Sequence, residues 1–212
     1  MIFKDRYDAG EQLAARLDKY KNLDDAVVLA LPRGGVIVGY KVAESLGLSL
    51  DILCPRKIGA PFNKEFAIGA ITETGEGVFS KEMISEMGVS QGYLVTEIEK
   101  EKKIAAERLK LYRKNREKRN LKDKVVILVD DGLATGATMR AAIKTVQSEK
   151  AKKIIVAVPV APPETLARIK KEVDEVICIS SPLAFFAVGQ FYENFNQTSD
   201  EEVISLLDKF QR

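Results

Sequence analysis

Two adjacent carboxylates, Asp130 and Asp131, follow a run of apolar residues and precede a loop of small residues, 132–138. Carboxylate oxygens only accept hydrogen bonds, so this pair suits a ligand with two neighbouring hydroxyl groups. The loop has little side-chain bulk, so its backbone N–H groups can converge, with the hydroxyls of Thr135 and Thr138, on a phosphate dianion. A diol beside a phosphate describes a sugar phosphate, in particular a ribose 5-phosphate.

The segments around this loop predict where it lies. Residues 125–129 are apolar and mostly β-branched, which indicates a strand buried on both faces. Apolar residues then recur at helical spacing at Met139, Ile143 and Val146. A strand, a loop and a helix in this order form half of a βαβ unit, which binds ligands at the carboxyl end of the strand.

Two other interpretations of this loop fit the sequence less well. An Asp-Gly pair also occurs in hairpin turns, but a helical pattern and not an alternating strand follows Gly136. A nucleoside-triphosphate P-loop is excluded, because the pattern G-x-x-x-x-G-K-[ST] and its lysine are absent.

A second unit of the same kind precedes the first. Residues 25–31 indicate a buried strand, a Pro-Arg-Gly-Gly sequence ends it, and residues 36–46 have helical apolar spacing. Gly34 and Gly35 free the backbone for a tight turn and a close approach to a ligand. Arg33 offers a charged fork for a phosphate. A plain glycine turn with a surface arginine is the alternative.

Composition bounds the protein class. With 212 residues and 46% hydrophobic content, the chain predicts one globular domain. Strand and helix alternate from residue 25 onward, which predicts a mostly parallel sheet with helices on both faces. We expect a cytoplasmic protein, because no apolar run approaches the ~20 residues of a membrane span and no signal peptide is readable. Histidine is absent, which excludes Ser-His triads and histidine metal sites.

The segment VVILVDDGLATGATM, residues 125–139, closely resembles the phosphoribosyl-diphosphate (PRPP) signature of type I phosphoribosyltransferases. The whole chain is similar to a bacterial group of provisionally named phosphoribosyltransferases whose base is not generally assigned. The resemblance implies that Asp130 and Asp131 hold the ribose 2′- and 3′-hydroxyls. The residues implied at the 5′-phosphate are Ala134, Thr135, Gly136, Ala137 and Thr138. The fold implied is the α/β, Rossmann-like phosphoribosyltransferase fold with a C-terminal hood.

The earlier glycine loop resembles the pyrophosphate loop of the family. The resemblance implies that Arg33 and the two glycines after it face pyrophosphate, and family members often carry a cis non-proline peptide bond there. The family also has a mobile loop that closes over the sugar and excludes water. The resemblance places this loop near residues 56–66, a segment rich in cations and loop formers, and leaves open whether 56–66 is itself the lid; Lys57 and Lys64 are the candidates to contact pyrophosphate. An ordinary solvated loop is the alternative for Lys64.

The expected organisation is a single domain, 1–212, whose core covers about 24–179. A helical insertion covers about 80–122, and the hood covers about 180–212 together with part of the N-terminus. The hood is rich in aromatic residues, and we expect three of them to contact the base through ring stacking. They are Phe185, Phe186 and Tyr192. A small satellite core is the alternative for this aromatic cluster.

Residues 100–124 are strongly basic, with 12 Lys and Arg against 4 Asp and Glu. Such a segment meets an anion or a nucleic acid, or it is simply a solvated helix face. We do not expect nucleic-acid binding, because no helix-turn-helix and no aromatic–glycine RNA motif is present. A PRPP- or nucleotide-responsive regulator that binds nucleic acid without turnover remains the alternative function. We expect a homodimer.

The reaction that the resemblance implies exchanges the pyrophosphate of PRPP for a nitrogenous base, with Mg²⁺ bound with PRPP. Asp130 and Asp131 would fix the ribose, while Arg33 would stabilise charge on the leaving pyrophosphate. No residue is assigned as a direct metal ligand. Enzymes for 6-oxopurines usually have an aspartate where this chain has Ala134, and often a lysine where it has Ala137. The motif is therefore more similar to adenine phosphoribosyltransferases, which argues against hypoxanthine and guanine without establishing adenine.

Overall fold

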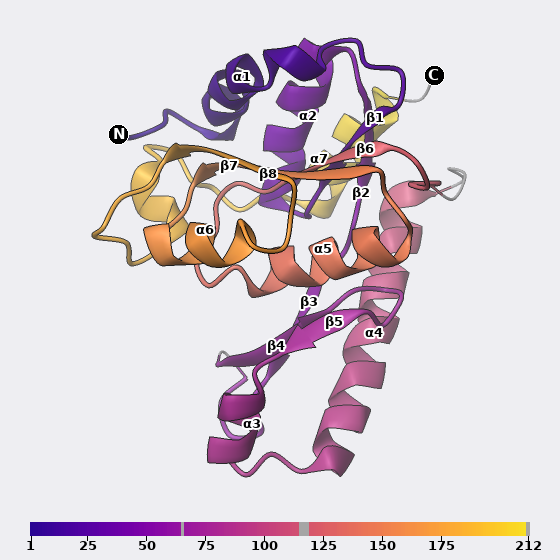
Figure 1. Cartoon of the computed structure of the whole chain (residues 1–212), viewed down its shortest axis with the longest axis vertical. Helices are drawn as coiled ribbons and strands as arrows, with labels where there is room; N and C mark the ends of the chain where they lie inside the picture. Colours follow the sequence, from indigo (N-terminus) through magenta and orange to yellow (C-terminus); the bar gives the residue numbers. More distant parts are fainter. Residues whose placement is uncertain (65, 115–118, 211–212) are drawn as a thin grey trace.

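The main body of the protein is built on a five-stranded parallel sheet (Figure 1). The structure is a computed structural model and describes residues 1–64, 66–114 and 119–210. The strand order is β2-β1-β6-β7-β8, and every neighbouring pair is parallel. The bounds are β1 Ala26–Ala30, β2 Ser49–Ile52, β6 Val125–Val129, β7 Lys153–Val160 and β8 Glu175–Ser180. All five residues of β1 and of β6 are buried, which confirms the sheet predicted from their apolar sequence.

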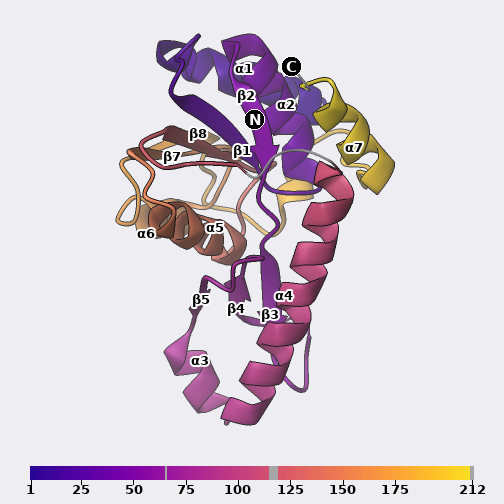
Figure 2. The same cartoon turned by 90° about the vertical axis from the view of Figure 1, so that its right-hand side faces the viewer.

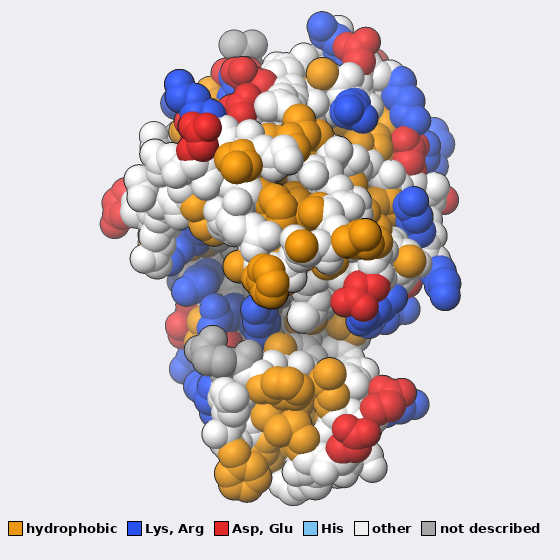
Figure 3. All heavy atoms as spheres, turned by 90° about the vertical axis from the view of Figure 1, so that its left-hand side faces the viewer, with side chains coloured by type: hydrophobic (Ala, Val, Ile, Leu, Met, Phe, Trp, Pro, Cys, Tyr) orange, Lys and Arg blue, Asp and Glu red, His pale blue; other side chains and the backbone are white. Residues whose placement is uncertain are grey.

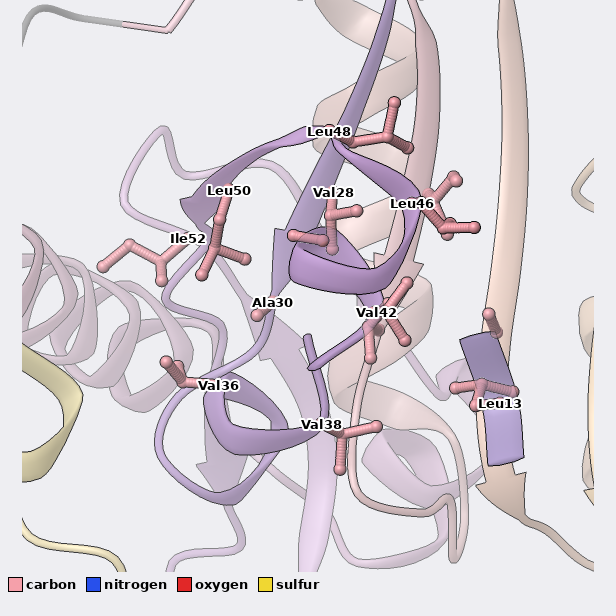
Figure 4. Packing of buried hydrophobic residues seen from close by; sticks show 14 of the residues in the cluster. Leu13, Val28, Ala30, Val36, Val38, Val42, Leu46, Leu48, Leu50 and Ile52 are labelled. Carbon is pink, nitrogen blue, oxygen red and sulfur yellow. The ribbon is translucent and has the colours of Figure 1, made fainter. Parts of the chain in front are cut away.

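Helices cover both faces of this sheet (Figure 1). One face carries α1 (Arg6–Arg16), α2 (Gly34–Leu46) and α7 (Asp200–Asp208), and the other carries α5 (Ala137–Ser148) and α6 (Pro163–Ile169). Figure 4 shows the packing on the first face. Leu13 of α1 and Val42 of α2 belong to the same buried hydrophobic cluster as Val28 and Ala30 of β1. The predicted α/β fold with helices on both faces is therefore confirmed.

A second, three-stranded antiparallel sheet forms a lobe beside the main body (Figure 1). Its strands are β3 (Arg56–Gly59), β4 (Ala67–Ile71) and β5 (Gly77–Phe79), and the helices α3 (Lys81–Glu86) and α4 (Gln91–Arg113) complete it. The long helix α4 runs from the lobe up to the main body (Figure 2). The sequence pattern predicts that it continues to about Arg119, but it ends at Arg113, and residues 115–118 lie outside the described part of the chain.

Part of the expected mobile loop is regular structure. The prediction of a loop over the whole of 56–66 was wrong for its first four residues, which form β3. The reason is burial: Ile58 and Ala60 are fully buried in the small core of the lobe, together with Ile68 and Leu94. Antiparallel pairing with β4 then satisfies the backbone of β3.

The hood segment, residues 181–199, covers the side of the main body seen at the left of Figure 1. It contains the 3₁₀ turn η2 (Val188–Phe191), and another 3₁₀ turn, η1 (Asp18–Tyr20), follows α1. Phe3 donates to Phe191 and accepts from Glu193, both at 2.8 Å, so the first residues of the chain pair with the hood segment. A final helix, α7, begins directly after Ser199, whose side chain accepts from the backbone N–H of Glu202. None of the helices among the described residues combines the length and apolarity needed to cross a membrane.

Candidate active site

The acid pair lies where β6 ends, and both side chains are partly buried. Asp130 Oδ1 accepts from the backbone N–H of Asp131 at 2.9 Å. The hydroxyl of Tyr192 donates to the backbone carbonyl of Asp131 at 2.5 Å. The turn at Asp130 and Asp131 is therefore held by two hydrogen bonds, one to the Asp130 side chain and one from Tyr192 of the hood segment.

A basic side chain that the sequence motifs did not point to, Arg6, forms an ion pair with one of the two acids. Arg6 of α1 donates through Nε to Asp131 Oδ2 at 2.7 Å. Its Nη1 donates to the backbone carbonyl of Asn196 at 2.7 Å, and its guanidinium lies 3.8 Å from the centre of the Phe195 ring. Arg6 is only 8% exposed. A buried charge of this kind needs a partner, and Asp131 supplies it.

These contacts separate the electrostatics of the two carboxyls. Burial raises the pKa of Asp130 well above its usual range, and the neighbouring charge of Asp131 raises that pKa further. Burial also raises the pKa of Asp131, but the guanidinium of Arg6 acts in the opposite direction. Asp131 is thus the carboxyl with a built-in counter-charge, and Asp130 is the one whose ionisation costs more.

The glycine loop packs directly against the acid pair. A Cβ added at Gly35 would lie 2.8 Å from Asp130 Oδ1 and 2.9 Å from Asp130 Cα, and one added at Gly34 would overlap Asp131 Oδ2. Only glycine permits this approach of the two backbones. The peptide bond between Pro32 and Arg33 is cis, the isomer that the resemblance implied for this loop.

The guanidinium of Arg33 faces helix α7 in this structure. Its Nη1 lies 3.6 Å from Asp200 Oδ1, and the hydroxyl of Tyr112 donates to the same oxygen at 2.5 Å. The side chain remains partly exposed, so a stronger anionic partner can compete for it.

The loop after the acid pair ends in the N-terminus of α5. Gly136 has φ +75° at the N-cap position, and a Cβ there would lie 2.8 Å from Thr165 Cγ2. Thr165 Oγ1 donates to the carbonyl of Ala134 at 2.7 Å, which fixes the loop from α6. The N-cap residue Gly136 has no side chain to cap α5, Thr135 Oγ1 accepts from the backbone N–H of Ala137 at 3.5 Å, and the first turn carries no acidic residue. Ala134 and Thr135 are exposed, while Ala137 and Thr138 open the helix. This loop can therefore bind an anion through backbone N–H groups.

The two lysines expected at the pyrophosphate belong to the lobe. Lys57 is exposed on β3. Lys64 donates to the hydroxyl of Tyr93 at 2.6 Å and pairs with Glu97 at 3.0 Å, both on α4. Figure 3 views the molecule from the side of the hood segment and shows Lys and Arg side chains gathered in the recess between the main body and the lobe.

A cavity of about 500 Å³ lies between the loop that precedes α5, which contributes Ala134 and Thr135, and the hood segment. Its lining includes Ala134, Pro162, Phe185 and Phe186. The ring of Phe185 packs against Phe191 with 5.2 Å between ring centres, whereas Phe186 is 90% exposed.

Tyr192 occupies a different environment from these two phenylalanines. It is 6% exposed, and its ring lies against Phe3 and Phe195. It contacts the site through its hydroxyl, which donates to Asp131.

The sequence held one signal for Arg6. Arg6, Gly10, Leu13 and Leu17 recur at helical spacing, and all four are buried on the inner face of the N-terminal helix and its end. An arginine on an apolar stripe requires an acidic partner elsewhere. The sequence could not say which acid this is, because Arg6 and Asp131 are 125 positions apart.

Comparison with known proteins agrees with this geometry. The sequence profile of the family described as "phosphoribosyl transferase domain" matches residues 2–196. The chain belongs to this family.

Two relatives of the family extend the comparison. A Mycobacterium tuberculosis protein provisionally named a phosphoribosyl transferase is 42% identical over 211 residues, which is 100% of this chain and 47% of the relative. The chain thus spans about half the length of the curated relatives it matches. The crystal structure of TT1426 from Thermus thermophilus is 43% identical, with a TM-score of 0.83 over 99% of both chains.

Proposed function

We propose that this protein transfers the phosphoribosyl group of PRPP to a nitrogenous base, releasing pyrophosphate and giving a nucleoside 5′-monophosphate. The observation that carries the proposal is the contact between the two loops. The acid pair, the anion-binding start of α5 and the glycine loop meet at adjacent strand ends, β6 and β1. That arrangement matches the three polar parts of PRPP, which are the diol, the 5′-phosphate and the pyrophosphate.

Each part of PRPP has a proposed set of partners. The ribose hydroxyls donate to the carboxylates of Asp130 and Asp131. The 5′-phosphate accepts from the backbone N–H groups and hydroxyls of 134–138. The glycine loop binds pyrophosphate, and Arg33 together with the lysines of the lobe adds positive charge there. Bond breaking then needs no protein nucleophile, because the site stabilises the charge that develops on the leaving pyrophosphate.

Mg²⁺ is proposed to enter with PRPP. In proteins this ion commonly keeps several waters and binds phosphate oxygens with one or two carboxylates. The part of the chain that the structure describes contains no group of three or more His, Cys, Asp or Glu side chains suited to a metal. The chemistry of the site therefore fits an ion carried by the substrate, which would neutralise charge on pyrophosphate. No residue is assigned as its direct ligand.

The base is proposed to lie in the cavity beside Phe185 and Phe186. Exposed aromatic faces there suit a planar heterocycle. Ala134 lines the same cavity, at the position where 6-oxopurine enzymes usually have an aspartate, and this supports a base other than a 6-oxopurine.

The alternative regulator draws less support from the structure. Several basic side chains of the segment 100–124 pair with acids of this chain and are partly neutralised. They are Lys100 with Glu97, Lys102 with Glu99, Arg113 with Asp51, and Lys114 with Asp208. A cytoplasmic location and a homodimer remain predictions of the sequence.

Turnover tests the proposal. A panel of purine, pyrimidine and related bases is incubated with the protein, PRPP and Mg²⁺, and new nucleoside monophosphates are sought by mass spectrometry. A product formed with at least one base, and formed much more slowly by the Asp130→Asn variant at the same PRPP concentration, supports the enzyme. PRPP binding without a product from any base would favour the regulator.

A further inference from the structure

Arg6 joins three parts of the molecule that are distant in sequence. Its own helix, α1, begins at this residue, and its guanidinium contacts the acid pair through Asp131 and the hood segment through Asn196 and Phe195. It also packs against the glycine loop and leaves no room for a side chain at Gly34, where a Cβ would lie 2.6 Å from Arg6 Nε. The guanidinium is thus built into the contact between the two loops of the site.

The carboxylate of Asp131 needs such a partner. Its side chain is 14% exposed, and burial disfavours its ionisation by raising the pKa of Asp131. The Nε–Oδ2 contact of 2.7 Å has the length of a charge-assisted hydrogen bond. Such a bond favours the charged form and also restricts rotation of the carboxylate plane.

We propose that Arg6 is a positioning residue for the ribose subsite, which holds the Asp131 carboxylate ionised and correctly oriented and so sets the affinity for PRPP. This inference rests on the proposed function. Because the same guanidinium is held by Asn196 and Phe195, it also links the order of the hood segment to the ribose subsite.

Three titratable or charged groups face Asp131. They are Arg6 from α1, Asp130 from the same loop and Tyr192 from the hood segment. Arg6 is the cation of this set. Without it, the pKa of Asp131 rises further, so the ionised fraction at a given pH falls and recovers as the pH increases.

The test measures PRPP·Mg²⁺ affinity by isothermal titration from about pH 7 to about pH 9, a range in which an unperturbed carboxyl stays ionised. Arg6→Met keeps the length of the side chain and its packing on Phe195 but removes the charge. Arg6→Lys keeps the charge but loses the fork. The matched control is Arg113→Met, which breaks a similarly buried pair with Asp51 (2.8 Å) away from the site.

We expect Arg6→Met to bind PRPP at least tenfold more weakly near pH 7, with a deficit that narrows as the pH rises. Arg6→Lys should lie between this variant and the wild type. Arg113→Met should lose thermal stability but keep the affinity and pH profile of the wild type.

Three results would overturn the inference. In the first, Arg6→Met binds like the wild type at every pH. In the second, its loss is the same at every pH and is shared by Arg6→Lys, which would leave Arg6 a packing role. In the third, the wild type itself fails to bind PRPP, and this result refutes the proposed function as well, whereas the first two leave it standing.

Discussion

Substituting the two site carboxylates one at a time should weaken ligand binding in both variants but destabilise only one of them. Each of Asp130→Asn and Asp131→Asn is expected to weaken PRPP·Mg²⁺ binding at least tenfold, or ~1.4 kcal/mol. This is a cautious threshold, because a hydrogen bond to a charged group is typically worth ~1.5–3 kcal/mol. Isothermal titration of both variants measures it.

The stabilities differ because only one acid has a counter-charge. Asp131→Asn leaves the Arg6 guanidinium, whose side chain is 9% exposed, without its anionic partner. Asparagine still accepts from Nε, so we expect the free energy of unfolding to fall by ~1.5 kcal/mol, at the lower end of the range for such bonds. For a chain of this size the melting temperature should fall by about 3–6 °C.

Asp130→Asn should instead leave the stability unchanged or increase it. The pKa of Asp130 is raised in the folded protein, so its ionisation opposes folding, and wild-type stability falls as the pH rises from about 3.9 through the raised value. Asparagine removes this penalty, and its advantage should appear at neutral pH and disappear in acid. Thermal melts at several pH values measure this. Equal destabilisation by both substitutions would refute the assignment of Arg6 to Asp131, and unchanged affinity in both would refute the ribose assignment.

Three further predictions address the loops, the cavity and the basic segment. Gly35→Ala should weaken PRPP binding severalfold and lower the melting temperature, because its Cβ meets the Asp130 backbone at 2.9 Å; Gly92→Ala, with open space around it, should do neither. Phe186→Ala should raise the KM for the base with little change in stability, because the ring is 90% exposed, while Val95→Ala, at an exposed position of α4 in the lobe, should leave KM unchanged. Gel shifts with random RNA and duplex DNA should show only weak, salt-sensitive binding, and sequence-selective nanomolar binding at physiological salt would favour the regulator.

The parts of the fold that follow local rules were predictable from sequence. The strand Val125–Val129 and the following loop and helix were found because a fully buried strand is continuously apolar and the loop carries an unusual set of residue types. The sequence does not predict the strand Arg56–Gly59, because it contains two cations, one glycine and a single apolar residue, Ile58. Its stability comes from pairing with β4 and from burial of Ile58, which are tertiary effects.

In the candidate site, too, some residues could be predicted from local sequence and others could not. The acid pair and the loop after it lie in one short motif, and the earlier glycine loop lies in another. Each could therefore be predicted from the residue types of a short continuous segment. The partners that fix them come from elsewhere in the chain: Arg6 for Asp131, Thr165 for Ala134, and Asp200 for Arg33. Contacts of such long sequence separation leave no periodicity to detect.

Binding of PRPP to the unmodified protein tests the central claim most directly. A scanning calorimetry experiment compares the wild type alone, with Mg²⁺, and with Mg²⁺ and PRPP. At a PRPP concentration ~100 times its dissociation constant, the ligand should add about 2.7 kcal/mol of stability. The melting temperature should then rise by roughly 5–11 °C, and the rise should be strongly reduced in Asp130→Asn. No shift of the wild-type transition at millimolar PRPP would contradict the assignment of this site.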